Sequence, residues 1–303
     1  MFDEIVGHIE VKNYLQKALL QKKLPNTLLF SGIEGIGKKK MALALAQKLL
    51  QKFPENHPDF HLLTPEGKSG THSIESIRDA IGESHTAPFQ AQVKVFMIES
   101  AERMQPASSN ALLKTLEEPT LDSYWILLSS APQEILPTIL SRCAKIPFHP
   151  LATSEIFSIL QKLKKPTELA PFSHGSLTKI LEISNFPQME EIQSLLFSLF
   201  SENITYPQQS IQLEKIEKLI DTEDPVQYQT RVKHLFALIS MYFRDGILRE
   251  TTPKSPYFFL QNQTCRTAQT NWEEILDEVR LAFERNIKLT TVLEYLLLKI
   301  RFR

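Results

Sequence analysis

A glycine-rich segment over residues 30–40 carries the residue types that bind phosphate groups. Its pattern is Gly32-x-x-x-x-Gly37-Lys38, with a third glycine, Gly35, inside it. An apolar run precedes the pattern and a helix-forming run follows it. In such a loop, glycines let backbone N–H groups turn toward a phosphate, and the helix N-terminus adds positive potential. The four residues are therefore candidate phosphate ligands, although an ordinary glycine turn also fits the pattern.

The residues that would hold the magnesium ion of such a site are replaced. Lys39 stands where a Ser or Thr hydroxyl normally coordinates Mg²⁺, and we expect its side chain to turn into solvent. The apolar run 93–98 ends in Glu99 and Ser100, where an Asp followed by an acidic base is expected. Glu99 is one methylene too long, and Ser100 cannot act as a base. We expect no ATP hydrolysis, whereas binding of ATP without hydrolysis stays open.

Arg142 is the candidate for a different kind of chemistry. It follows a short predicted helix and precedes the last predicted strand. A solvated arginine at a helix end is one interpretation, and spacing alone favours it. The other is an arginine finger, whose planar guanidinium binds the γ-phosphate of ATP held by a neighbouring subunit.

Composition excludes several classes of function. With 34 Lys and Arg against 35 Asp and Glu in 303 residues, no global field attracts nucleic acid or an anionic membrane. The chain begins without signal-peptide features and contains no apolar run long enough to cross a bilayer. Two distant cysteines, Cys143 and Cys265, predict a reducing cytoplasm and no disulfide framework. His57, His61 and His72 have no cysteines nearby that would complete a metal site.

The elements that must position these residues change character near residue 150. Before it, strands alternate with helices, which predicts an α/β fold with a parallel sheet covered on both faces. The strands are predicted over 27–30, 60–63, 93–98, 125–129 and 144–148. After it, only amphipathic helical patterns follow, which indicates packed helices.

Five segments together resemble the AAA+ clamp-loader family, and within it the delta-prime branch of bacterial DNA polymerase III. The most specific is Asn110–Pro119, which has the sequence NALLKTLEEP. The others are Phe2–Gly7, Leu24–Gly32, His57–Asp59 and Ser141–Cys143.

The resemblance implies an AAA+ P-loop domain over residues 1–149, a small helical lid over 150–185 and an all-α collar over 186–303. It implies a hetero-pentameric ring with motor and delta-type subunits, which loads the sliding clamp on primed DNA. It also makes Arg142 the finger that acts in trans on a neighbour's ATP.

Departures from the family pattern all weaken nucleotide chemistry. The four cysteines of the family's zinc module are missing before His57, so no zinc is expected. Thr178, in Gly175–Thr178, stands where motor subunits carry a phosphate-sensing arginine. The sequence thus predicts a non-hydrolysing stator that requires no cofactor. Its rivals are a motor ATPase that uses Glu99 with another base, and a stand-alone DNA-binding adaptor, against which the neutral charge argues.

Overall fold

The computed structural model divides the chain into two compact units. The described residues are 2, 4–66, 70–120, 122–173, 175–184, 189–200, 204–251, 271–285 and 287–300. The first unit comprises Met1–Ile159 and Ser173–Thr178, and the second comprises Leu160–Phe172 and Lys179–Arg303. Cys265 and the predicted domain boundary at 185–186 lie outside the described residues. The division into three domains stays a prediction.

A five-stranded parallel sheet forms the centre of the first unit, in the order β2-β3-β4-β1-β5. Its strands are β1 Thr27–Ser31, β2 Phe60–Leu63, β3 Lys94–Ile98, β4 Ser123–Ser129 and β5 Ala144–Pro147. All five predicted strands are confirmed within two residues of their ends, and so is the parallel arrangement. Short β1 and β3 are buried almost throughout because both faces of the sheet are covered.

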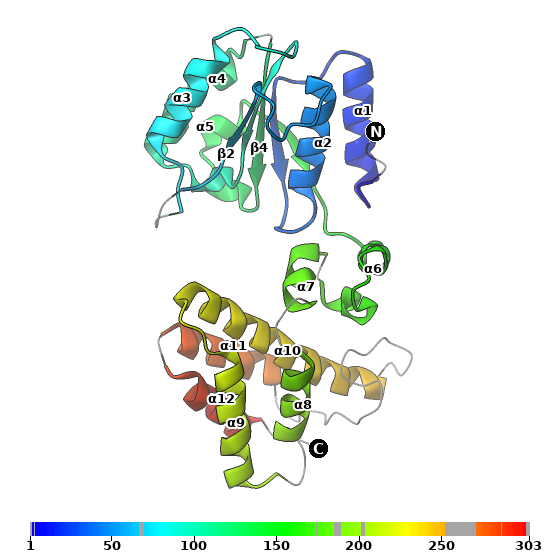
Figure 1. Ribbon diagram of the computed structural model, residues 1–303, viewed down its shortest axis with the longest axis vertical. Helices are drawn as coiled ribbons and strands as arrows, with labels where there is room; N and C mark the ends of the chain where they lie inside the picture. The colour runs from blue at the N-terminus through cyan, green and yellow to red at the C-terminus, as the bar shows by residue number, and fades with distance from the viewer. Residues whose placement is uncertain are drawn as a thin grey trace. The chain divides into compact units, whose positions relative to one another are not determined.

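Helices cover both faces of this sheet, as Figure 1 shows. Their bounds are α1 Ile9–Leu20, α2 Lys38–Leu50, α3 Ile74–Ser84, α4 Pro106–Glu117 and α5 Pro137–Leu140. Helices α1 and α2 pack on one face, and α3 and α4 on the other. Two single turns of 3-10 helix, Ala101–Arg103 and Pro132–Glu134, follow β3 and β4.

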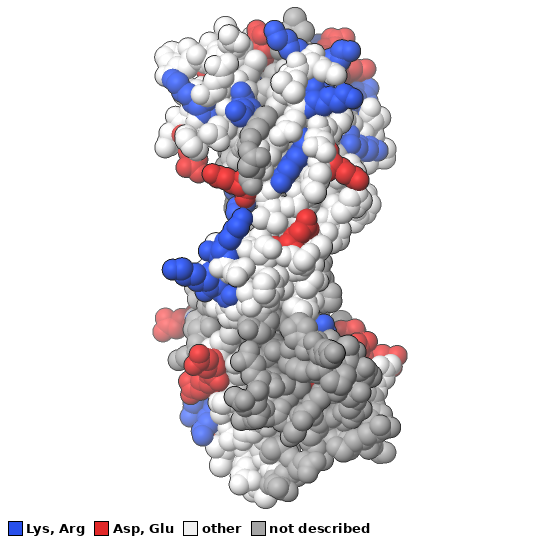
Figure 2. All heavy atoms as spheres, turned by 90° about the vertical axis from the view of Figure 1, so that its right-hand side faces the viewer, with Lys and Arg blue, Asp and Glu red and all other residues white. Residues whose placement is uncertain are grey.

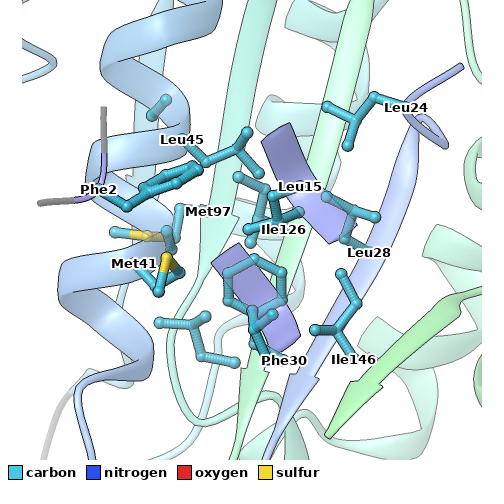
Figure 3. Packing of buried hydrophobic residues seen from close by; sticks show 14 of the residues in the cluster. Phe2, Leu15, Leu24, Leu28, Phe30, Met41, Leu45, Met97, Ile126 and Ile146 are labelled. Atoms are coloured by element: carbon cyan, nitrogen blue, oxygen red, sulfur yellow. The ribbon is translucent and has the colours of Figure 1, made fainter. Parts of the chain in front are cut away.

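The core beneath α1 and α2 joins the N-terminal segment to the sheet. Phe2, Leu15 and Met41 meet Phe30 and Ile126 there, as Figure 3 shows, and all five side chains are at most 1% exposed. Burial of this apolar surface fixes α2, and with it the glycine loop that precedes α2, against the carboxyl end of the sheet.

The opposite face of the sheet contains a stack of three rings. The ring centroids of His61 and Phe96 are 4.7 Å apart, and those of Phe96 and Trp125 are 4.4 Å apart. The rings come from β2, β3 and β4, which are neighbours in the sheet. Trp125 is fully buried. Stacking of this kind adds a geometric preference to the hydrophobic burial of the sheet.

Asp59 anchors the loop that leads into β3. Its fully buried carboxylate accepts backbone hydrogen bonds from Phe89 at 2.6 Å, Gln90 at 2.7 Å and Ala91 at 2.8 Å. Burial alone would raise the pKa of Asp59, but the three backbone N–H groups, with a smaller contribution from His57, hold it below the usual value. Asp59 therefore stays ionised, and its predicted motif His57–Asp59 has a structural task.

The remaining chain is helical in its described part. The elements are α6 Thr153–Lys162, a 3-10 turn Thr167–Ser173, α7 Leu177–Ser184, α8 Met189–Leu199, α9 Tyr206–Ile220, α10 Pro225–Thr251, α11 Trp272–Glu284 and α12 Leu289–Lys299. This confirms the predicted change to helices after residue 150. None of the described helices is both long enough and apolar enough to span a bilayer.

Candidate functional site

The glycine loop connects β1 to α2 at the carboxyl edge of the sheet. Gly32 continues the ladder, since its N–H donates to the Ser129 carbonyl at 3.2 Å. Gly35 and Gly37 have φ angles of +79° and +100°, a region that residues with a side chain rarely adopt. Lys38 is the first residue of α2. The predicted order of strand, glycine loop and helix is thereby confirmed.

Lys38 is folded back onto its own loop. Its Nζ donates to the carbonyl oxygens of Gly32 and Ile33, at 2.8 Å in the second case. Burial lowers the pKa of Lys38 below its usual value, while Glu102 and Glu34 act in the opposite direction. In this arrangement the ammonium group donates hydrogen bonds to carbonyl oxygens of its own loop and does not point away from the loop.

The Lys39 side chain is more than half exposed, in line with the prediction, but its ammonium group also forms an ion pair that the sequence did not indicate. Its Nζ lies 2.6 Å from Oε1 of Glu99, which follows β3. The Lys39 side chain is 54% exposed and that of Glu99 is 22% exposed. The two residues come together because β3 is one strand removed from β1 and both strands end at the same edge.

This ion pair does not fit a magnesium site. Mg²⁺ requires oxygen ligands, and here the carboxylate of Glu99 is paired with an ammonium group. A unit positive charge about 4 Å from a divalent cation costs about 8 kcal/mol at an effective dielectric constant of about 20. Among the described residues, no group of three His, Cys, Asp or Glu side chains could hold a metal ion.

Glu102 is a charged residue of this region that the sequence pattern did not single out. Its Oε1 accepts hydrogen bonds from the Ser130 hydroxyl at 2.7 Å and the Ser130 N–H at 3.2 Å. Burial would raise the pKa of Glu102, but these bonds and one from Ser129 hold it below the usual value. A carboxylate held this way is a weak base. The signal available in the sequence was its position three residues after Glu99.

Residues 176–178 lie directly against the glycine loop. The Leu177 N–H donates to the Gly35 carbonyl at 2.9 Å. A Cβ atom on Gly35 would lie 2.3 Å from the Ser176 hydroxyl oxygen and 2.8 Å from Cβ of Thr178. Thr178, identified from the sequence as a departure, is thus brought to the loop. Its short hydroxyl side chain supplies no positive charge there.

Arg142 lies at the opposite edge of the sheet from the glycine loop. It precedes β5, which runs parallel to β1, so it belongs to the amino edge, whereas the loop follows β1 at the carboxyl edge. Five-residue β1 separates the edges by about 15 Å at about 3.3 Å per residue. Arg142 and the four residues Gly32, Gly35, Gly37 and Lys38 therefore do not form one site within this chain.

The Arg142 side chain is partly exposed and forms an ion pair with Glu117 at the end of α4. Its Nη2 lies 3.0 Å from Oε2 of Glu117, and the two side chains are 30% and 58% exposed. The next residue, Cys143, is buried, and burial raises the pKa of its thiol to about 12. Of the two neighbours, only the arginine can take part in chemistry at the surface. The 25-residue gap between Glu117 and Arg142 gave no sequence signal for their pairing.

Charges on the first unit do not indicate a nucleic-acid surface on the face that Figure 2 shows. Basic side chains there lie among acidic and uncharged ones, without one continuous basic area. A protein that binds DNA by itself generally concentrates Lys and Arg on one face. This face therefore gives no support to a stand-alone DNA-binding adaptor.

Comparison with known proteins relates this arrangement to clamp-loader subunits. Residues 7–152 match the family model described as "DNA polymerase III, delta subunit". The delta-prime subunit of DNA polymerase III of Bacillus subtilis (strain 168) is 32% identical over 163 residues, which are 48% of this chain and 49% of the relative. The tau subunit of that organism is 30% identical over 190 residues, 58% of this chain and 34% of the relative.

An archaeal relative extends the likeness beyond bacteria. The replication factor C small subunit of Methanococcus maripaludis (strain C7) is 30% identical over 195 residues, which are 63% of this chain and 59% of the relative. The chain thus spans between about a third and three fifths of the length of these curated relatives.

A solved structure extends the fold comparison to nearly the whole chain. It is a DNA polymerase III gamma subunit-related protein from Thermotoga maritima, with a TM-score of 0.53 and 17% identity, covering 95% of this chain and 97% of that one. At this identity the match concerns the fold alone. Together with the parallel sheet and the helical C-terminal region, it confirms the predicted fold class, an α/β domain with a parallel sheet followed by helices.

Proposed function

We propose, from the similarity of residues 7–152 to the DNA polymerase III delta family model and of the chain to a delta-prime subunit, that this chain is a non-hydrolysing, delta-prime-like stator of the replicative clamp loader. In this role it joins a hetero-pentameric ring with motor and delta-type subunits in the cytoplasm. The ring acts on the sliding clamp and primed DNA. The chain is not an ATPase by itself, and it requires neither zinc nor another cofactor.

One observation carries the non-hydrolysing part of the proposal. The Lys39 ammonium lies on Glu99, where an active site would hold Mg²⁺ between a hydroxyl and a carboxylate. Phosphoryl transfer depends on that ion to neutralise charge that develops on the phosphate oxygens. The Lys39 ammonium at Glu99 supplies a positive charge but cannot coordinate oxygen ligands as Mg²⁺ does. The glycine loop, with Lys38 as its cation, remains as a vestigial phosphate site.

The trans-acting part of the proposal rests on where Arg142 lies. The amino edge of the sheet is too far from the chain's own glycine loop for Arg142 to contact a phosphate there. A partly exposed guanidinium at the surface can instead reach a nucleotide held by an adjoining subunit. An arginine supplied in trans in this way stabilises the negative charge of the transition state.

The isolated chain should show no ATP turnover, and Mg²⁺ should not tighten any binding of ATP. The reason is that the Lys39 ammonium pairs with Glu99, the carboxylate that would otherwise be available to the ion. Equilibrium titration with labelled ATP, in Mg²⁺ and in excess chelator, measures the dissociation constant for ATP. Phosphate release measures turnover. Lys39→Ser should restore a dependence of ATP affinity on Mg²⁺ without restoring turnover, since Ser100 still supplies no base.

Magnesium-dependent turnover by the unmodified chain would instead establish a motor ATPase that uses Glu99 with another base. Ring membership is tested separately, by capture of the tagged chain with purified motor and delta-type subunits. A stable complex supports the stator. If the chain captures no subunit but binds DNA with a steep salt dependence, the adaptor is the better description.

A further inference from the structure

The Arg142 guanidinium is almost fully engaged within its own chain. Both Nε and Nη2 donate to the same oxygen, Oε2 of Glu117, at 3.2 and 3.0 Å. Nη1 donates to the Thr138 carbonyl at 3.0 Å and to the Ser141 hydroxyl at 3.4 Å. A guanidinium has five N–H donors. Among the described residues, these contacts occupy four of them and leave a single N–H on Nη2.

A phosphate group needs more than that single donor. Arginine recognises phosphoryl oxygens most strongly through two parallel N–H bonds. Arg142 must therefore give up at least one present contact before it can bind a phosphate in this way. The Thr138 carbonyl is fixed by the backbone of α5, whereas Glu117 is a flexible side chain that is 58% exposed. Glu117 is the contact that can be released.

We propose that Glu117 is a positioning residue for Arg142, which holds the guanidinium in place and competes with the neighbour's ATP for it. This inference rests on the proposed function, because it requires Arg142 to serve a neighbouring ATP site. Binding of that ATP then includes an exchange, in which Arg142 stops donating to the carboxylate oxygen of Glu117 and donates to phosphoryl oxygens instead.

The geometry of the Arg142–Glu117 pair favours its replacement by contacts to phosphate. Both bonds to Glu117 end on one oxygen, so the pair lacks the two-oxygen fork that makes arginine–carboxylate pairs strong. Its side chains are also accessible to water, and exposed ion pairs are weak. A triphosphate carries more negative charge than the Glu117 carboxylate, and it can offer two oxygens to the Arg142 guanidinium at once. Without a neighbour, Glu117 and Thr138 still keep the long arginine side chain in one conformation.

Glu117→Gln in the assembled clamp loader tests the competition. Glutamine has nearly the same shape but cannot pair with the charge, so ATP no longer has to displace a carboxylate. We expect the KM for ATP, and the dissociation constant of a fluorescent ATP analogue, to fall by about three- to fivefold. The kcat should stay within about twofold, because the transition state meets the same arginine. Glu118→Gln is the matched control, since Glu118 is the adjacent exposed glutamate and makes no hydrogen bond to Arg142 within the described residues.

Three outcomes separate this inference from the proposed function. If Glu117→Gln lowers kcat and leaves KM unchanged, Glu117 orients the finger and does not compete, which overturns the proposal. If neither constant changes, the proposal is also overturned. The fall in KM must disappear in an Arg142→Ala background, because the effect passes through Arg142. If Arg142→Ala alone leaves no bound ATP unhydrolysed in a single-turnover experiment, the proposed function itself has failed.

A measurement on the isolated chain checks the contact before any ring is assembled. The ¹⁵N resonance of the Arg142 Nε–H group should shift and broaden in Glu117→Gln, since its acceptor is weakened. The same resonance should be unchanged in Glu118→Gln. An unshifted resonance in Glu117→Gln means that the ion pair does not form in solution, and the inference then fails independently of the clamp loader.

Discussion

Arg142→Ala should slow ATP hydrolysis at the adjoining motor subunit by about 10³-fold, because an arginine finger contributes at least that factor to kcat. The ring should still assemble, since within the described residues Arg142 contacts exposed side chains and one backbone carbonyl. Other motor sites would hide the loss in a steady-state assay. A single-turnover experiment avoids this, because the affected site appears as a fraction of bound ATP that stays unhydrolysed.

Arg142→Lys distinguishes the fork of the guanidinium from its charge. Lysine keeps the positive charge but offers no pair of coplanar N–H groups, so we expect most of the rate to remain lost. Full activity in Arg142→Lys would reduce the role of Arg142 to general electrostatics. Full activity in Arg142→Ala would contradict the finger altogether and leave an ordinary solvated arginine, the interpretation that spacing alone favoured.

Asp59→Ala should destabilise the first unit by about 3 kcal/mol. The substitution removes the carboxylate that accepts hydrogen bonds from Phe89, Gln90 and Ala91. Each buried donor left without a partner costs about 1–3 kcal/mol, and water can reach part of this exposed loop, which lowers the total. Urea unfolding measures the free energy of unfolding. Asp79→Asn, at an exposed carboxylate on α3, is the control and should change it by less than about 0.5 kcal/mol.

The contribution of Asp59 should depend on pH in a known direction. Because its pKa in the folded state lies below the unfolded value of about 3.9, its stabilisation is present above that value and is lost as pH falls through the folded pKa. The difference in unfolding free energy between the unmodified chain and Asp59→Asn should therefore shrink between about pH 5 and pH 2. A difference that is independent of pH would show that the charge of Asp59 does not matter.

Local patterns predicted most of the fold because local physics determines those parts. Ser73 stands just before a helical pattern, which predicts a helix cap, and its hydroxyl oxygen accepts the Ser76 N–H at 3.1 Å. Errors occurred at element ends, where apolar periodicity says little. The helical pattern after the glycine loop continues to about Phe53 and predicts a helix end there, but α2 stops at Leu50 because Gln51 adopts a left-handed conformation. The pattern predicts a short helix over 135–141, whereas α5 begins at Pro137, as suits a proline in the first helical turn.

The candidate site was predictable only where one segment carries it. The glycine loop could be found because strand, glycines and helix are contiguous in the sequence. The ion pairs could not, since Lys39 and Glu99 meet only after three strands have assembled side by side. The same holds for Glu117 and Arg142. From its position in the sequence alone, the Lys39 side chain is expected to turn into solvent. Its pairing with Glu99 can be recognised only once the sheet has brought the two residues together.

The ring stack in the sheet has a practical consequence for measurement. The chain has two tryptophans, and the structure places Trp125 in the first unit and Trp272 in the second. Both are at most 9% exposed, with Trp125 stacked on Phe96 and Trp272 close to Phe243. Indole fluorescence responds strongly to the loss of such an environment. Trp272→Phe and Trp125→Phe therefore convert one chain into two spectroscopic probes, each of which follows the unfolding of a single unit.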